Sequence, residues 1–211
     1  RPTLTWYRFT LGFLRTNEYG QYQLGSNAVR LSATAWSCHD MVAYAEPLLR
    51  QFASENEVSV NLATEVEGEM RYHACCRSPA RLSVNLQVGS AVPVARTAIR
   101  RAFYAASSRA RQAVIISNLK ESLSNEAFTH AKSALTCAAE HYEQYGYTVS
   151  DGEFSTDILA VAVGVYDIAT GQYAYSLNAS VPSANWAVDD YTAMIVPKLQ
   201  ALAERIGGGD A

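Results

Sequence analysis

The chain has 211 residues, 49% of them hydrophobic and 18% charged, so it can bury one full core and carry a small extension. No apolar run reaches the roughly 18 residues of a membrane span, and residues 1–3 do not open a secretion signal. We therefore expect a cytoplasmic protein without a membrane partner. The net charge of −3 argues against nucleic-acid binding by the chain as a whole.

The charge is unevenly distributed. Residues 1–25 contain three arginines and one acidic residue, so this segment sums to +2 and the remainder to −5. Contact with phosphate, if any, is expected in this first segment.

The cysteines do not have the spacing of a zinc site or of a disulfide framework. They are Cys38, Cys75, Cys76 and Cys137. We expect reduced thiols that act as small hydrophobic residues, with no metal and no cofactor.

The first 24 residues predict the end of a winged helix. A short helix is expected over residues 3–14, with Pro2 near its first turn and Gly12 near its end. A hairpin is expected over residues 14–24, because residues 16–20 have the composition of a hairpin loop. The earlier helices of such a fold have no room upstream, so we expect the sequence to be part of a longer protein.

The rest of the chain predicts an α+β fold. Helical spacing runs over residues 24–55, where Pro47 should bend or break the helix, and returns over residues 94–106 (less regularly to 119), 128–145 and 189–206. Strand patterns occupy residues 58–66, 69–77, 81–88, 147–150, 158–166 and 173–180. Two-residue connections after the first two strands favour antiparallel pairing.

Five segments occur in a fixed order along the chain: QYQLG (21–25), AEPLL (45–49), VNLA (60–63), VGSAVP (88–93) and GYTVSDGE (146–153). Together they resemble the IclR family of bacterial transcription regulators. The resemblance implies a GAF-like effector domain with a six-stranded antiparallel sheet flanked by helices, preceded by a partial winged helix. The implied domains are residues 1–24 (winged helix), 25–40 (linker helix) and 41–211 (effector domain).

The resemblance also implies a function. Such a regulator binds operator DNA as a dimer or tetramer, and a small carboxylic acid, aliphatic or aromatic, controls it from the C-terminal domain. The sequence departs from the family after the proline loop, where the family has a His and then small residues including Gly. This chain has ARTAIRR at 95–101 instead, with a bulky Ile99 and a charged Arg100.

Family positions place the effector pocket on the 95–106 helix and the later strands. The candidate ligand-binding residues are Val84, Val92, Arg96, Thr97, Ala98, Ile99, Ser150, Asp151, Ile158, Ala160, Asn178 and Ser180. The start of that helix can attract a carboxylate through its free N–H groups and its dipole. Strand alternation supports the grouping, since Ser176, Asn178 and Ser180 share one face.

Each polar candidate has a second interpretation. Asn178 and Ser180 either bind the ligand or bond to local backbone or water. Arg96 either clamps a carboxylate or is a solvated loop arginine. Asp151 and Glu153 are either polar pocket wall or loop caps.

In the N-terminal segment, the residues expected to face the major groove are Thr3, Thr5, Trp6 and Arg8. Arg8 either reads a guanine or touches phosphate only, and Trp6 either faces DNA or packs on upstream helices.

Two other functions remain as alternatives. One is a Cys-dependent enzyme, in which Cys75 is the nucleophile and His73 the base, since residues two apart on a strand share a face. No third orienting residue or nucleophile elbow accompanies them, so we expect no catalytic residue. The other is a stand-alone small-molecule binding module, against which the predicted helix and hairpin argue.

Overall fold

A computed structural model of the chain describes residues 11–28, 41–66, 69–78, 86–92 and 96–208. It divides into two compact units, Arg1–Asp40 and Met41–Ala211. In the first unit, β1 (Leu14–Thr16) and β2 (Tyr22–Leu24) form an antiparallel hairpin. The hairpin prediction is confirmed. The helix predicted over residues 3–14 lies mostly outside the described residues.

The second unit is built on an antiparallel sheet. Its strands are β3 (Ser59–Val66), β4 (Glu69–Cys76), β5 (Thr148–Asp151), β6 (Ile158–Asp167) and β7 (Gln172–Pro182). They lie in the order β4-β3-β7-β6-β5, and every neighbouring pair is antiparallel. The predicted α+β fold class is confirmed.

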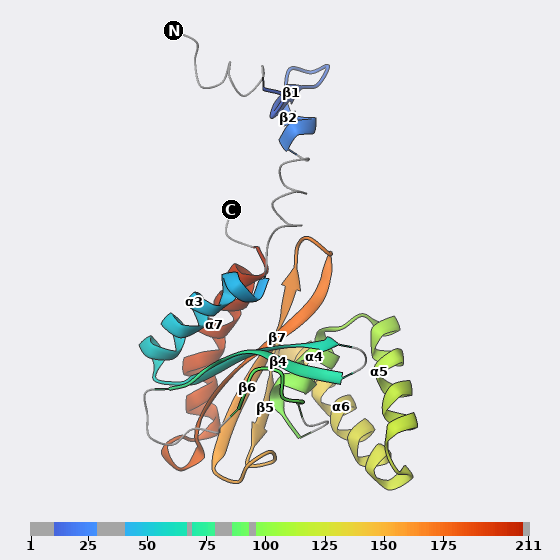
Figure 1. Cartoon of the computed structure of the whole chain (residues 1–211), viewed down its shortest axis with the longest axis vertical. Helices are drawn as coiled ribbons and strands as arrows, with labels where there is room; N and C mark the ends of the chain where they lie inside the picture. The colour runs from blue at the N-terminus through green and yellow to red at the C-terminus, as the bar shows by residue number, and fades with distance from the viewer. Residues whose placement is uncertain (1–10, 29–40, 67–68, 79–85, 93–95, 209–211) are drawn as a thin grey trace. The chain divides into compact units, whose positions relative to one another are not determined.

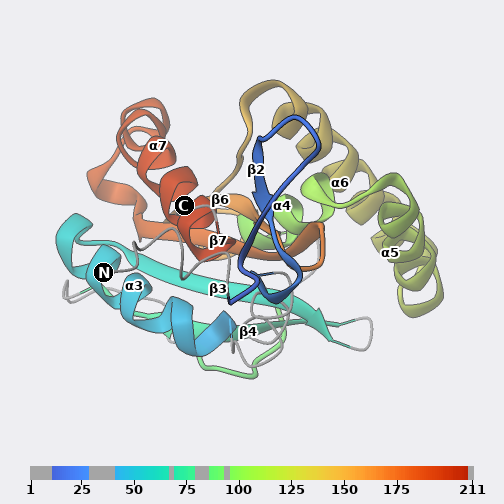
Figure 2. The same cartoon turned by 90° about the horizontal axis from the view of Figure 1, so that it is seen from above.

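Helices cover both faces of this sheet. They are α3 (Met41–Asn56), α4 (Ala98–Ala106), α5 (Arg109–Ser122), α6 (Asn125–Tyr145) and α7 (Val188–Ile206). Figure 1 shows α3 and α7 on one side and α4, α5 and α6 on the other, and Figure 2 shows the same sheet from above. α3 continues through Pro47, so the predicted break does not occur.

Within the described residues, the predicted sixth strand is not part of the sheet. Residues 86–88 belong to no strand of the described sheet, and the rest of the predicted 81–88 strand lies outside the described residues. The segment just after it follows the β4 edge instead: Gly89 N donates to Tyr72 O (2.7 Å), and Val92 N donates to Met70 O (2.7 Å). An isolated bridge joins Ala91 to Arg71. The described sheet therefore has five strands.

The two faces of the sheet differ in side-chain size because neighbouring residues on a strand point to opposite faces. On β6 the α3/α7 face carries Leu159, Val161, Val163 and Val165, which pack in one buried apolar cluster. On the α4 face, the middle of β6 and β7 carries small or polar residues, which are Ala160, Ala162, Gly164, Ser176, Asn178 and Ser180. The second face therefore has room for a closely packed helix and for a cavity.

Gly164 on β6 lies close to the end of α4 and to α6. A Cβ atom at this position would lie 2.6 Å from the Cβ of Ala106 and 2.9 Å from Cδ1 of Tyr173. The Gly164 N–H donates to the hydroxyl of Tyr142 on α6 (3.0 Å). The absence of a side chain at this position therefore allows α4 and α6 to pack against the sheet.

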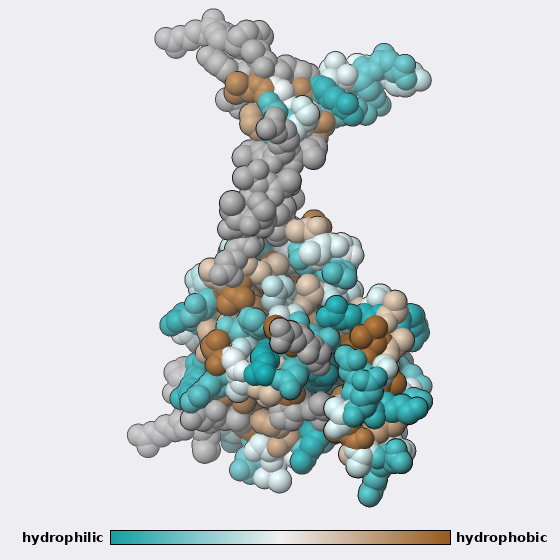
Figure 3. Space-filling view, turned by 45° about the vertical axis from the view of Figure 1, so that its right-hand side comes forward, coloured by the Kyte–Doolittle hydropathy of each residue, from teal (hydrophilic) through white to brown (hydrophobic). Residues whose placement is uncertain are grey.

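Polar side chains cover much of the surface of the second unit. Figure 3 shows hydrophilic residues over most of the visible face of the second unit, with apolar residues in scattered patches. Within the described part of the chain, no helix is long and apolar enough to cross a membrane.

Candidate functional site

A small cavity lies between the start of α4 and the sheet. Its lining residues are Tyr72, Leu86, Thr97, Ala98, Ser150, Phe154, Ile158, Ala160, Asn178 and Ser180. Its free volume is about 30 Å³, which is room for about one or two water molecules. It combines an apolar floor with polar groups from three strands and a helix start, which is the composition of a small-molecule site.

Three hydroxyl groups of the sheet fix the start of α4. Thr148 Oγ1 donates to Ala98 O (2.7 Å), Ser150 Oγ to Arg96 O (2.9 Å), and Ser176 Oγ to Ile99 O (3.0 Å). These bonds come from β5 and β7, so two strands position one helix end. Fixing the carbonyls also fixes the direction of the amide N–H groups in the first turn of α4.

The start of α4 is electropositive. Thr97 precedes α4 without a capping hydrogen bond from its side chain to the helix. The first N–H groups of a helix have no partner within the helix and attract anions. Arg100 adds a positive charge in the same turn while only 3% exposed, and burial lowers its pKa although Glu65 and Glu69 oppose this.

Seven of the predicted ligand-binding residues line the cavity: Thr97, Ala98, Ser150, Ile158, Ala160, Asn178 and Ser180. Val92 and Ile99 lie in the apolar cluster under α4, and Asp151 is exposed at the end of β5. Arg96 Nε donates to Glu153 O (2.7 Å), so its side chain binds a loop rather than the cavity. Val84 and the DNA-facing candidates Thr3, Thr5, Trp6 and Arg8 lie outside the described residues.

Three cavity residues are missing from the sequence prediction. Tyr72 on β4 faces α4, and its burial raises the pKa of the phenol well above its usual range, so the hydroxyl stays protonated and can donate. Phe154 follows directly after the GYTVSDGE segment, and Leu86 precedes the VGSAVP segment. Strand alternation on β4 could have identified Tyr72. No periodicity identifies the other two, because both lie in loops.

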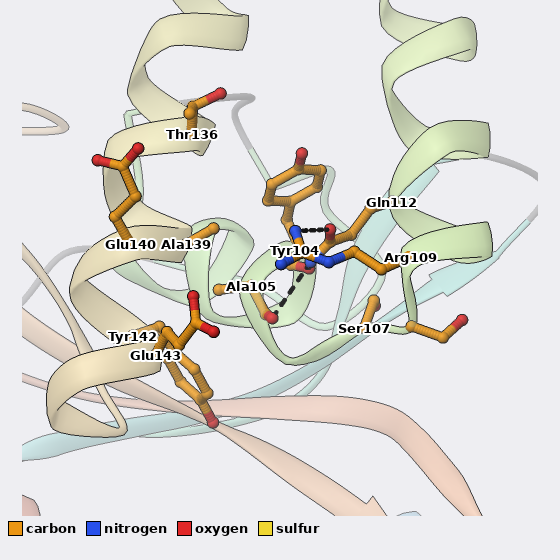
Figure 4. Close-up of a pocket in the computed structure, with 11 residues that line it drawn as sticks. Tyr104, Ala105, Ser107, Arg109, Gln112, Thr136, Ala139, Glu140, Tyr142 and Glu143 are labelled. Atoms are coloured by element: carbon orange, nitrogen blue, oxygen red, sulfur yellow. Dashed lines mark hydrogen bonds between the residues drawn. The ribbon is translucent and has the colours of Figure 1, made fainter.

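A larger groove of about 700 Å³ runs between the first turn of α5 and α6 (Figure 4). Gln112 on its floor donates from Nε2 to Tyr104 O (3.1 Å) and Ala105 O (3.3 Å), and it accepts from Arg109 Nη1 (3.4 Å). Glu140 and Glu143 extend from α6 on the opposite wall (Figure 4). The amide of Gln112 is therefore already used within the protein, and the cavity under α4 is the better ligand site.

Cys75 does not lie in the surroundings of an active-site nucleophile. Burial raises the pKa of Cys75 to about 11, which lowers the thiolate fraction at neutral pH. His73 packs edge-on against Tyr175 at a centroid distance of 6.5 Å, and its Nε2 is buried without a hydrogen-bond partner. Among the described residues, no three His, Cys, Asp or Glu side chains group as a metal site.

The helix-covered sheet and its cavity define a ligand-binding domain of the α+β class. Residues 33–207 match the family described as bacterial transcriptional regulator IclR C-terminal. The chain therefore belongs to the IclR family.

Similar proteins support this assignment. The HTH-type transcriptional regulator TsaQ1/TsaQ2 of Comamonas testosteroni is 24% identical over 158 residues, which cover 74% of this chain and 56% of that protein. The IclR family transcriptional regulator from Brucella abortus is 26% identical, with a TM-score of 0.70 over 99% of this chain and 78% of that one. The chain thus spans little more than half of the curated relative.

A second similar structure is an isolated domain. It is the inducer binding domain of PobR from Acinetobacter, a double mutant in complex with 3-hydroxy benzoic acid. It is 18% identical to this chain, with a TM-score of 0.65 over 80% of this chain and 98% of that domain.

Proposed function

We propose that this chain is the sensor part of a bacterial transcription regulator, in which a small carboxylic acid binds in the cavity under α4 and controls binding to operator DNA. One observation carries the proposal: the electropositive start of α4 and the buried amide of Asn178 line the same cavity. Nδ2 of Asn178 donates to no acceptor among the described residues, although this residue is only 6% exposed.

The cavity favours an acid because its donors converge. No Lys or Arg is among its described lining residues, so the helix start supplies the positive potential. Ile158, Ala160 and Leu86 supply the apolar surface for the carbon chain. In the similar PobR domain the bound molecule is also a carboxylic acid. The free volume of about 30 Å³ favours a short acid and requires part of the wall to move.

We also propose that the chain acts on DNA as a dimer or tetramer in the cytoplasm. The β1–β2 hairpin has the place of a wing, after the predicted recognition helix. Leu24, Ala28, Leu31 and Ala35 repeat at helical spacing and can form a two-fold contact between copies. Light scattering on the protein should show a species of at least two chains at micromolar concentration. A strictly monomeric species would overturn the dimer.

The ligand proposal is tested by a thermal-shift screen of short carboxylic acids, followed by calorimetry on variants. Ala160→Leu should abolish binding, because three added carbon atoms exceed the free volume at the cavity floor. Asn178→Ala should weaken binding several-fold, as expected for the loss of one hydrogen bond. Circular dichroism checks the fold of each variant. If both folded variants bind the acid as the parent does, the cavity is not the site.

A further inference from the structure

Two asparagines form a buried pair across the middle of the sheet. Asn61 on β3 lies directly opposite Asn178 on β7, and its Nδ2 donates to Oδ1 of Asn178 (3.0 Å). The two side chains are 3% and 6% exposed. Of the pair, only Asn178 lines the cavity. A carboxamide whose oxygen is engaged in this way turns its nitrogen away from the partner, so Asn61 sets which end of the Asn178 amide is free.

The two serine hydroxyls that line the cavity already donate their hydrogens to backbone carbonyls. Ser150 Oγ donates to Arg96 O (2.9 Å), and Ser180 Oγ donates to Ser59 O (3.4 Å). Each serine can therefore offer a ligand only the lone pairs of its oxygen. Asn178 differs, because its Nδ2 carries two hydrogens with no acceptor among the described residues.

These groups define which acid the cavity accepts, provided that the proposed function holds. One set of donors, at the start of α4, faces a carboxylate. A separate donor, Nδ2 of Asn178, would remain unpaired beside a plain hydrocarbon chain, and an unpaired buried donor is costly. A carbonyl or hydroxyl oxygen on the chain of the acid would accept from it.

We propose that the cavity selects short acids that carry a second oxygen, a hydroxyl or a carbonyl, and that Asn61 is the positioning residue for this selection. Asn178 contacts the second oxygen of the ligand. Asn61 acts through Asn178 by holding its amide with the nitrogen toward the cavity.

The test compares three four-carbon acids, butyrate, 3-hydroxybutyrate and 3-oxobutyrate, by calorimetry on the full chain. Both oxygen-bearing acids should bind about five-fold more tightly than butyrate, as expected for one hydrogen bond. Asn178→Leu should remove this preference. Asn61→Leu should reduce it while changing butyrate affinity less than about two-fold, because Asn61 itself does not line the cavity. Asn61→Ser, whose hydroxyl is too short to reach Asn178, provides a second variant if Asn61→Leu does not fold.

The matched control is Ile158→Val, which trims the apolar floor and should weaken all three acids alike. If an Asn61 variant changes only the ratio of the affinities for the oxygen-bearing acids and for butyrate, Asn61 positions the Asn178 amide. A general structural effect would change all three affinities. Equal affinity of the parent for the three acids, or an unchanged ratio in folded Asn61 variants, would overturn the inference. A third outcome is that all three acids bind the parent equally well and that Ala160→Leu abolishes this binding. That outcome would overturn the inference and leave the proposed function unaffected. Failure of all three acids to bind would overturn both.

Discussion

Arg101 of α4 and Glu153 of the loop after β5 form a two-pronged ion pair. Nη1 of Arg101 lies 2.7 Å from Oε1 of Glu153, and Nη2 contacts Oε2. The same Nη1 also donates to Val149 O (3.0 Å). We call residues 152–157 the strap. The strap carries Phe154, which is one of three cavity residues outside regular structure. The ion pair therefore holds a cavity wall that can move without breaking the sheet.

Glu153→Gln should loosen the strap. The substitution keeps the shape of the side chain and removes the charge that faces Arg101, whose side chain is only 10% exposed. Hydrogen–deuterium exchange at residues 154–158 should become a few-fold faster, while exchange in α7 should not change. Arg50→Gln breaks the exposed Arg50–Glu46 pair and is the control that leaves the strap unchanged. If the strap exchanges hydrogen equally fast in Glu153→Gln and in the parent, contacts other than this ion pair hold the strap in place.

Removing the hydroxyl groups of two buried tyrosines should change the stability of the protein in opposite directions. The hydroxyl of Tyr191 is buried without a hydrogen-bond partner, so Tyr191→Phe should raise the free energy of unfolding by about 1 kcal/mol. The hydroxyl of Tyr142 accepts from Gly164 N, so Tyr142→Phe should lower it by about 1 to 2 kcal/mol. Urea unfolding measures both. A destabilised Tyr191→Phe would show that its hydroxyl has a partner in solution.

Gly164→Ala should separate α4 from the sheet. The added Cβ would approach Ala106 and Tyr173 closer than real Cβ atoms do, and overpacking of this kind costs about 1 to 3 kcal/mol. The melting temperature should fall by several degrees. Acid binding should weaken as well, because the start of α4 forms one wall of the cavity. Ala160→Gly, on the same strand and face, adds no clash and should leave α4 in place.

Thiol labelling should distinguish the cysteines by pH. The raised pKa of Cys75 means that its thiolate, and so its labelling rate, should keep increasing about ten-fold per pH unit up to about pH 11. Cys137 is exposed on α6 and should react first near pH 8. Mass spectrometry of iodoacetamide-treated protein identifies the modified residue. Rapid labelling of Cys75 at pH 7 would revive the enzyme hypothesis.

The sequence predicted the described helices and strands of the second unit to within a few residues, except at the sheet edge. Long periodic segments such as α7 are specified by their own apolar spacing. The β4 edge is different, because the segment 89–92 pairs through backbone groups that leave no mark on side-chain periodicity. The sequence left open whether Pro47 bends or breaks its helix, and α3 continues through it because the rest of the helix packs on the core.

The candidate site was predictable where strands carry it and not where loops do. Alternation along β6 and β7 placed Ile158, Ala160, Asn178 and Ser180 on one face, and the structure has them at the cavity. Phe154 and Leu86 reach it from loops, and Asn61 reaches Asn178 across strands that are 117 residues apart in sequence. Such contacts depend on strand order, which a single sequence does not specify.

The pairing of residues 89–92 with β4 has a consequence for how copies of this protein meet. An open strand edge is a template onto which another chain can add, and long open edges promote aggregation. Here the backbone of Tyr72 and Met70 on the β4 edge is already occupied. At the opposite edge β5 has only four residues. Past the end of β5, Gly164 N on β6 donates to the hydroxyl of Tyr142. Part of each margin of the described sheet is thus occupied, which disfavours joining two copies through a continuous sheet at these positions.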